Sequence, residues 1–208
     1  MRVNHFDASS SSSLLLRIVS GIKNIAMESK DVTAVKNVTE ELVEAMFDLS
    51  TTKTGAIVVL ENTTKLGEHI QTGKIVDATV STELIKNIFY NGSPLHDGAV
   101  IVRDLRIYAA SCFLPLSSHS KDIEHLGSRH RAAVGVSEKS DALVLVVSEE
   151  TGTVSIAYKG SLTRQFTQET LYDTIYSFFN QQNVKVHLQN AKKGKKKNNK
   201  GGQAQNEQ

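Results

Sequence analysis

Short apolar runs bounded by turn residues recur along this chain and restrict the folds open to it. The clearest covers residues 55–60, GAIVVL, and another covers residues 142–147, ALVLVV. Runs of this length are typical of strands that are buried on both faces of a sheet. A helix that spans a membrane needs roughly 20 apolar residues in a row, and no run here approaches that length.

Helical patterns alternate with these runs. Amphipathic spacing predicts helices over residues 14–28 and 33–50, and Ser81 is expected to cap a helix that ends near Asn91-Gly92. Three further helices are predicted over residues 64–71, over 129–138 and after a cap at Thr167, and an edge strand is predicted over 184–188.

Two pairs of runs have the form of antiparallel hairpins. Gly98–Arg103 and Arg106–Leu114 flank the turn pair Asp104-Leu105, and residues 142–148 and 153–159 flank a loop. Hairpins are antiparallel, whereas interleaved helices favour parallel strands. We therefore predict an α/β domain with a mixed sheet, flanked by helices and preceded by a short helical N-terminal segment.

Length, composition and charge divide the chain into three parts. It has 208 residues, of which 39% are hydrophobic, so one domain of ordinary size with tails is expected. We place a polar and helical N-terminal segment at residues 1–32, a compact domain at 33–190 and a disordered lysine-rich tail at 191–208. The tail holds six of the 24 basic and one of the 22 acidic residues, so the rest of the chain carries 18 basic and 21 acidic residues. A mildly acidic folded part argues against a protein that coats DNA, and no DNA partner is expected.

Cys112 is the one cysteine in the sequence. A disulfide within the chain and a multi-cysteine zinc site are therefore excluded, and a reducing cytoplasm is the expected compartment. The lysine-rich tail is most simply a solvated tail. The alternative is a segment that attracts RNA or an anionic membrane surface.

Three short polar segments carry the residues that could perform chemistry. The first, SPLHDGA at residues 93–99, lies directly before a predicted strand. Its Asp97-Gly98 pair is first of all a turn signal. The functional alternative is a carboxylate at the edge of the sheet, with Gly98 permitting close approach of a ligand and His96 available to a metal.

The second segment, GSRHRAA at residues 127–133, begins a predicted helix. Arg129, His130 and Arg131 crowd its first turn, where the helix dipole disfavours cations. A bound phosphate would explain the arginines, because the free N–H groups of a helix N-terminus bind anions as well. The alternative is an ordinary solvated basic turn.

The third segment, SEETG at residues 148–152, links the two strands of the second hairpin. A plain hairpin loop is the simpler interpretation, and a carboxylate for a divalent metal carried by a nucleotide is the functional one. The chain contains neither GxxxxGK[ST] nor GxGxxG, so P-loop and Rossmann phosphate sites are excluded.

Taken in this order, the three segments resemble the diadenylate cyclase domain family. Its two signature motifs, Asp-Gly-Ala and Arg-His-Arg, stand here as Asp97-Gly98-Ala99 and Arg129-His130-Arg131. The catalytic region is most similar to the membrane-associated class of the family, without the transmembrane segment of that class. The similarity covers about residues 40–180 and continues in the flanks, as PLHDGAVIV at 94–102, LPLS at 114–117, GSRHRAAVGVSE at 127–138 and VSEETGTVSIAYKG at 147–160.

This resemblance implies an enzyme, a nucleotidyltransferase that condenses two ATP molecules into the second messenger cyclic di-AMP and releases two pyrophosphates. The 3′-hydroxyl of each ATP attacks the α-phosphate of the other, and a divalent metal, Mg²⁺ or Mn²⁺, is the implied cofactor. Residues 33–190 are accordingly interpreted as the catalytic domain.

The resemblance also implies roles for individual residues. Asp97 is expected to hold or deprotonate the 3′-hydroxyl, with Gly98 and Ala99 letting the nucleotide approach the backbone. Tyr108 lies where the family packs the adenine. The residues expected to hold the phosphates are Gly127, Ser128, Arg129, His130 and Arg131, with Ser148 and Glu149 in the loop near the triphosphate. The metal candidates are His96, Asp97 and Glu149.

One domain of this family binds one ATP, so the reaction requires two domains face to face. The implied partners are ATP and a second copy of the chain, in a homodimer or in a higher oligomer built from such pairs. The expected location is cytoplasmic, either as a free protein or as the cytoplasmic part of a longer, membrane-anchored parent.

Two other functions stay open on the sequence alone. A non-catalytic sensor of the same fold would bind ATP or a cyclic dinucleotide without turnover, but the intact Asp97, Arg129 and Arg131 argue against a loss of catalysis. An RNA-associated or scaffold protein would act through the lysine-rich tail.

Overall fold

The computed structural model describes residues 32–117 and 127–181. Its strands are β1 (Ala56–Leu60), β2 (Lys74–Thr79), β3 (Ala99–Arg103), β4 (Arg106–Cys112), β5 (Leu143–Val147), β6 (Val154–Tyr158) and β7 (Ser161–Arg164). Its helices are α2 (Gly67–Ile70), α3 (Thr82–Phe89) and α4 (Ser128–Lys139), together with helices over residues 32–51 and 168–181.

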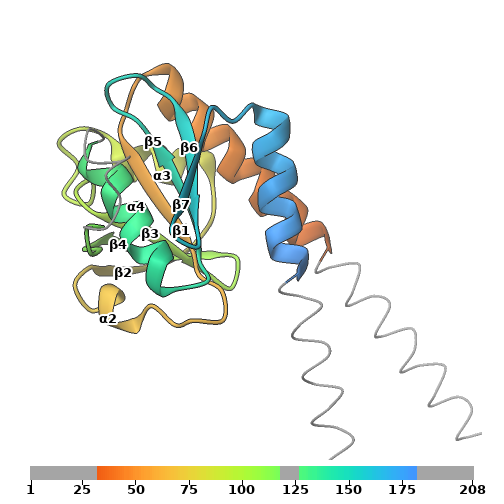
Figure 1. Cartoon of the computed structure of the whole chain (residues 1–208). Coiled ribbons are helices and arrows are strands. Elements are labelled where there is room, and N and C mark those ends of the chain that lie inside the picture. Colours follow the sequence, from red (N-terminus) through yellow and green to blue (C-terminus); the bar gives the residue numbers. More distant parts are fainter. Residues whose placement is uncertain (1–31, 118–126, 182–208) are drawn as a thin grey trace, which may run out of the picture.

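The strands form one mixed sheet in the order β2-β4-β3-β1-β5-β6-β7 (Figure 1). β1 and β3 run parallel, with Val58 opposite Val100, and every other neighbouring pair is antiparallel. This arrangement confirms the predicted α/β class with a mixed sheet. The central strands β1 and β5 are buried at every position, as their continuous apolar sequences predicted.

Helices cover both faces of the sheet. The helices over 32–51 and 168–181 lie side by side on one face (Figure 1) and share a large apolar cluster with α3, to which Leu42, Ile85 and Ile175 belong. α4 covers the other face, where Ala133 and Val136 pack into a second apolar cluster. The sheet is therefore the middle of three layers, and α4 is the helix whose N-terminus reaches the candidate site.

Local signals of the sequence are found where they were predicted. The Ser81 hydroxyl accepts a hydrogen bond from the Leu84 N–H at 3.3 Å and caps α3. Thr167 caps the helix over 168–181 in the same way, through the Thr170 N–H at 3.2 Å. Asp104 and Leu105 both have positive φ, 50° and 60°, which suits the two-residue turn between β3 and β4.

Two strands, β2 and β7, were not predicted from the sequence. Both lie at edges of the sheet and are largely exposed, so neither has the continuous apolar pattern of a buried strand. β2 also carries an irregularity between Ile75 and Ala78, where Asp77 has a φ of 46°. The alternation that marks a half-buried strand is broken at that point.

The helix predicted over 14–28, the edge strand predicted over 184–188 and the lysine-rich tail lie outside the described residues. Within the described ranges, no helix combines the length and the apolar character that crossing a membrane requires.

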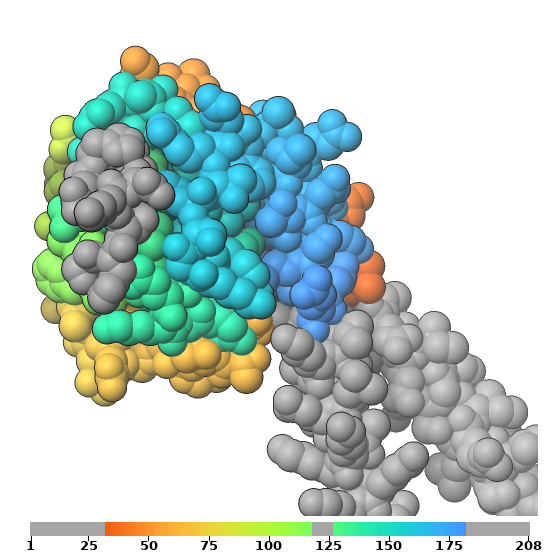
Figure 2. All heavy atoms as spheres, in the orientation of Figure 1, coloured from red at the N-terminus to blue at the C-terminus, as the bar shows by residue number. Residues whose placement is uncertain are grey.

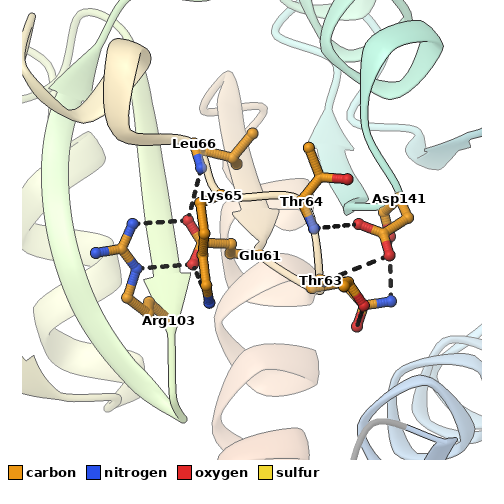
Figure 3. Close-up of polar contacts among 8 residues, drawn as sticks. Glu61, Thr63, Thr64, Lys65, Leu66, Arg103 and Asp141 are labelled. Atoms are coloured by element: carbon orange, nitrogen blue, oxygen red, sulfur yellow. Dashed lines mark hydrogen bonds and ion pairs between the residues drawn. The ribbon is translucent and has the colours of Figure 1, made fainter. Parts of the chain in front are cut away.

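An ion-pair network around the buried Glu61 carboxylate lies at the ends of β1 and β3 (Figure 3). Both carboxylate oxygens of Glu61 accept from the Arg103 guanidinium at 2.7 Å, and one also accepts from the Leu66 N–H at 2.9 Å. Burial alone would raise the pKa of Glu61, but these hydrogen bonds outweigh it and hold the pKa below its usual 4.5. Nearby, Asp141 accepts from the N–H groups of Thr63 and Thr64. The network therefore fixes the loop that follows β1.

Candidate active site

The three polar segments singled out in the sequence meet at one end of the sheet. β1 and β3 run parallel, so Gly55 and Asp97, which precede them, lie at the same end. β5 runs antiparallel to β1, with Ala56 opposite Val147, and this brings Ser148 to that end as well. The N-terminus of α4 completes the arrangement, because Ser128 and Arg129 line hollows together with these segments.

The first hollow lies around the aspartate of the first segment. Its volume is about 960 Å³ when the space that is open to solvent is counted, and its walls include Asp97, Gly98 and Ala99. Asp97 is exposed, and among the described residues its carboxylate has no hydrogen-bond or ion-pair partner. An unpaired carboxylate at the rim of a hollow is available to accept a proton or a hydroxyl hydrogen bond.

Gly98 is required here by the neighbouring strand. Its φ is +105°, and a Cβ at this position would lie 2.7 Å from the Ser111 carbonyl carbon and 2.9 Å from the Cys112 nitrogen. Ser111, itself at a φ of 56°, donates from its hydroxyl to the Asp97 carbonyl at 2.6 Å. The close approach of β4 therefore fixes the backbone on which the Asp97 side chain is carried.

The segment after β4 forms an apolar wall of the same hollow. Phe113 and Leu116 are 64% and 50% exposed, and both line it. The segment is held against α4, where a Cβ on Gly135 would lie 2.1 Å from the Pro115 carbonyl. Ser117 ties it further, because its N–H donates to the Arg131 carbonyl and its hydroxyl donates to the Glu138 carboxylate. An exposed aromatic ring on an anchored segment is suited to stacking on a flat ligand.

The second hollow lies at the N-terminus of α4. Ser128 and Arg129 line both hollows and so form their common border. Gly127 precedes α4 without a side-chain cap, and the first turn contains no acidic residue. The predicted anion site rests on the N–H groups at the start of this turn and stays a prediction, since the N–H groups of His130 and Arg131 already donate to the Gly127 carbonyl. The second hollow is a small depression that is open to solvent, and further residues that line it are Ser148, Glu149, Glu150, Thr151 and Arg164.

The loop of the third segment is built as a tight hairpin connection. The Ser148 hydroxyl accepts from the Thr151 N–H at 3.2 Å, and the Gly152 N–H donates to the Ser148 carbonyl at 2.9 Å. Ser50, at the end of the helix over 32–51, donates from its hydroxyl to the Gly152 carbonyl at 2.6 Å. The plain structural interpretation of this loop therefore holds, and the loop also presents Ser148 and Glu149 to the second hollow.

Arg129 and Glu149 form an ion pair at this hollow, Nη1 to Oε2. Gly55 makes room for it, since a Cβ there would lie 2.6 Å from Arg129 Nη1 and 3.0 Å from Glu149 Cβ. This role of Gly55 could not be predicted from the sequence, because the Arg129 side chain that Gly55 accommodates is remote in the chain. A side chain at residue 55 would displace the Arg129 guanidinium.

His130 points into the protein. It is 4% exposed, and its Nε2 has no hydrogen-bond partner among the described residues. Burial lowers its pKa below the usual 6.5, and the charges of Arg164 and Arg129 act in the same direction, while Glu150 opposes them. The imidazole is therefore neutral at pH 7 and forms part of the wall of the second hollow.

Three residues assigned from the sequence lie apart from the two hollows. Tyr108 lines neither, and the Arg103 guanidinium lies over its ring at 4.3 Å from the centroid. The aromatic ring in the first hollow is that of Phe113, just beyond the same strand. Arg131 and His96 also line neither hollow. The assignment of Tyr108 to the adenine stays a prediction that the lining of the two hollows does not support.

The metal candidates are divided between the parts of the site. Asp97 lines the first hollow and Glu149 the second, and no group of three potential ligands is found within the described ranges. His96 Nδ1 lies 2.6 Å from the Ser93 carbonyl. A carbonyl only accepts, so Nδ1 is the donor in this contact, and Nε2 is the ring nitrogen that is left for a metal. This donor set fits Mg²⁺ or Mn²⁺ that arrives on a nucleotide, because such ions take one or two carboxylates and complete their shell with phosphates and water.

Comparisons with known proteins agree with this geometry. Residues 43–162 match the family model described as DisA bacterial checkpoint controller nucleotide-binding, abbreviated DAC. The chain is similar to a protein named diadenylate cyclase from Mycoplasma pneumoniae, at 40% identity over 80% of this chain and 81% of that protein. It is also similar to cyclic di-AMP synthase CdaA of Bacillus subtilis, at 43% identity over 73% of this chain, but spans only 57% of that protein's length. Among solved structures, DacA from Staphylococcus aureus superposes with a TM-score of 0.65 at 38% identity, over 74% of this chain and 98% of that one.

Proposed function

The chain belongs to the DAC family of diadenylate cyclase domains, and from this premise we propose that it condenses two molecules of ATP into cyclic di-AMP and releases two pyrophosphates. The observation that carries the proposal is the common border of the two hollows, formed by Ser128 and Arg129. A nucleotide that lies across this border has its nucleoside beside Asp97 and its phosphates at the N-terminus of α4.

The first hollow suits the nucleoside. Phe113 and Leu116 offer exposed apolar surface on which the adenine can stack. Asp97 then faces the ribose, and its unpaired carboxylate accepts the proton of the 3′-hydroxyl. General-base assistance of this kind typically contributes about 10²- to 10⁴-fold to a rate.

The second hollow suits the phosphates. The N–H groups of the first turn of α4, the hydroxyls of Ser128 and Ser148 and the guanidinium of Arg129 all lie at it. Phosphoryl transfer depends mainly on positioning and on neutralising the charge of the equatorial oxygens. These groups supply both, without covalent participation by the protein.

The reaction needs two domains. In each half, the 3′-oxygen of one ATP forms a bond to the α-phosphorus of the other, the bond from that phosphorus to the β-phosphate bridging oxygen breaks, and pyrophosphate leaves. Asp97 takes the hydroxyl proton. One chain offers one Asp97 hollow, so we place two chains face to face, each holding one ATP, in a homodimer or in a larger assembly of such pairs.

A divalent ion fits this site as part of the nucleotide complex. Glu149, Asp97 and the Nε2 of His96 are the candidate protein donors. When bound, Mg²⁺ or Mn²⁺ would neutralise phosphate charge and favour departure of pyrophosphate. We place the reaction in the cytoplasm, where ATP is found, with attachment to a membrane through a longer parent protein as an extension of the same proposal.

Product analysis tests this function. The purified chain is incubated with ATP and Mn²⁺ or Mg²⁺, and the nucleotides are identified by mass spectrometry and pyrophosphate is quantified. The proposal predicts cyclic di-AMP with two pyrophosphates released for each cyclic product. ATP that binds but stays unconverted at every protein concentration would favour the sensor function over the cyclase.

A further inference from the structure

We propose that Arg164 binds the terminal phosphates of the substrate and thereby makes the site select nucleoside triphosphates over monophosphates. This inference rests on the proposed function and adds a residue that neither signature motif contains. Arg164 lies on β7, the strand that the sequence did not predict, and it lines the second hollow together with Ser128, Arg129 and Ser148.

The β6–β7 hairpin delivers Arg164 to the site. The turn between the strands contains Lys159 and Gly160, whose φ values are 49° and 77°. β7 then runs back along β6, so that Arg164 lies opposite Ser155 near the start of β6. That end of β6 is the end at which β5 leads into Ser148, because Val147 is opposite Val154.

The backbone beside Arg164 is fixed. The N–H groups of Gln165 and Phe166 both donate to the Val154 carbonyl, at 3.1 and 3.3 Å. β7 itself lies at the surface of the molecule, between α4 and the helix over 168–181 (Figure 2). An arginine on an anchored strand end loses less conformational entropy on binding an anion than one on a free loop.

The side chain of Arg164 belongs to the α4 face of the sheet. Leu162, two residues earlier on β7, packs with the apolar cluster of that face, to which Ala157 and Ala133 also belong. Alternation along a strand places residues two apart on the same face. Arg164 therefore shares its side of the sheet with the first turn of α4, which agrees with its place in the lining of the second hollow.

The charges of the hollow single out Arg164. Arg129 is engaged with Glu149, whereas Arg164 is exposed and has no ion pair with any residue in the described ranges. A second, independent observation comes from the wall of the hollow, where His130 is 4% exposed and its Nε2 has no partner among the described residues. The buried, unpartnered Nε2 lies in the same wall as Arg129, Arg164 and Glu150, and a buried polar atom without a partner is a place where a ligand can supply one.

The order of atoms in ATP decides which phosphates Arg164 meets. With the nucleoside beside Asp97, the α-phosphate reaches the common border at Ser128 and Arg129 first. The β- and γ-phosphates then extend into the second hollow. Arg164 lines this hollow and does not line the first one. A guanidinium there gives charge-assisted, bidentate contacts to phosphate oxygens.

Binding of unreactive nucleotides tests the inference apart from turnover. 3′-deoxy-ATP and 3′-deoxy-AMP lack the attacking hydroxyl, so calorimetry with Mg²⁺ measures affinity alone. Arg164→Gln should weaken 3′-deoxy-ATP binding about 10- to 100-fold, as expected for a lost charged hydrogen bond, and change 3′-deoxy-AMP binding less than about 2-fold. Arg164→Lys should recover part of the loss. Lys159→Gln is the matched control, since it removes one exposed cation from the other end of the same hairpin and should change neither affinity.

The outcomes separate this inference from the proposed function. Selective loss of the triphosphate affinity, with pyrophosphate also becoming a weaker competitor, supports the role of Arg164. Unchanged affinity in Arg164→Gln, or an equal loss for both nucleotides, overturns it even if the wild-type chain makes cyclic di-AMP. A folded wild-type chain that binds no 3′-deoxy-ATP overturns both.

Discussion

The Arg129 guanidinium donates to the Glu149 carboxylate across the second hollow, and Gly55 provides the space that the pair occupies. Arg129 is 24% exposed and Glu149 is 61% exposed, so solvent reaches the carboxylate more than the guanidinium. In the proposed function, a nucleotide with its metal would compete for both partners at once, because the phosphates attract the arginine and the metal attracts the carboxylate. The pair would then balance the charge of the proposed phosphate site until substrate arrives.

Gly55→Ala should move Arg129 and weaken ATP binding. The added Cβ would lie 2.6 Å from Arg129 Nη1, and the flexible side chain is the part that can yield. We expect a loss of about 10-fold in affinity with little change in the melting temperature. Gly67→Ala is the matched control, because nothing lies within 4 Å of a Cβ at Gly67. Equal affinities for wild type and Gly55→Ala, measured by calorimetry, would contradict the role of Gly55.

The two arginines of the Arg-His-Arg motif should differ. Arg129 lines both hollows, whereas Arg131 lines neither and uses its carbonyl to accept from the Ser117 N–H. Arg129→Ala should lower the affinity for ATP about 10- to 100-fold, and Arg131→Ala should lower it less. Calorimetric titration of the two variants with ATP distinguishes a phosphate role for Arg129 alone, which the lining of the hollows favours, from an equal role for both arginines of the motif. If Arg131→Ala is as weak a binder as Arg129→Ala, the geometric assignment is wrong.

His130 should make the protein sensitive to mild acid. Burial, followed by the charges of Arg164 and Arg129, keeps the pKa of folded His130 below the 6.5 of an unperturbed histidine. The unfolded chain then binds the proton more tightly than the folded chain, so the free energy of unfolding falls as the pH drops below about 6.5 and continues to fall until the folded pKa is reached. Urea unfolding over about pH 5 to 7 should show this slope in wild type and a smaller slope in His130→Gln. Identical slopes would show that His130 does not titrate differently in the two states.

Glu61 should stabilise the fold without taking part in the site. Its carboxylate is 1% exposed and accepts two hydrogen bonds from Arg103, at the end of β1 and β3 opposite to Asp97. Glu61→Gln should lower the free energy of unfolding by about 2 kcal/mol or more, since the arginine keeps its charge and loses its counter-ion. Glu68→Gln, an exposed carboxylate on α2, is the control and should stay within about 0.5 kcal/mol of wild type. A Glu61→Gln variant as stable as that control would refute the structural role of the network.

The sequence predicted the parts of the fold whose signals are local. The buried strands β1 and β5 follow from their continuous apolar runs, and Ser81 marks the start of α3. β7 could not be found in this way, because four largely exposed residues carry no periodic signal and owe their conformation to pairing with β6. Arg164 could not be predicted as a site residue for the same reason, because it reaches the second hollow only through the pairing of β7 with β6.

The residues of the candidate site that could be predicted from the sequence are those that belong to the three polar segments. Asp97, Ser128, Arg129 and Glu149 line the two hollows, and the roles assigned to them from the sequence stay predictions. Tyr108 was assigned to the adenine from the family resemblance; its ring lies under the Arg103 guanidinium and lines neither hollow, so that role stays a prediction. Phe113 lay inside the strand predicted over Arg106–Leu114, whereas β4 ends at Cys112, so the sequence did not indicate that the Phe113 ring is exposed at the first hollow.

The most direct test of catalysis by two facing domains is to titrate wild-type protein with Asp97→Asn at constant total concentration. The variant should bind ATP with unchanged affinity and form pairs, yet form no cyclic di-AMP, because each half-reaction uses the carboxylate beside its own 3′-hydroxyl. Cyclic product then requires two wild-type partners, so an equilibrated equal mixture should work at about a quarter of the wild-type rate. A rate of about one half would mean that each domain acts alone, and full activity of the variant by itself would remove Asp97 from the mechanism.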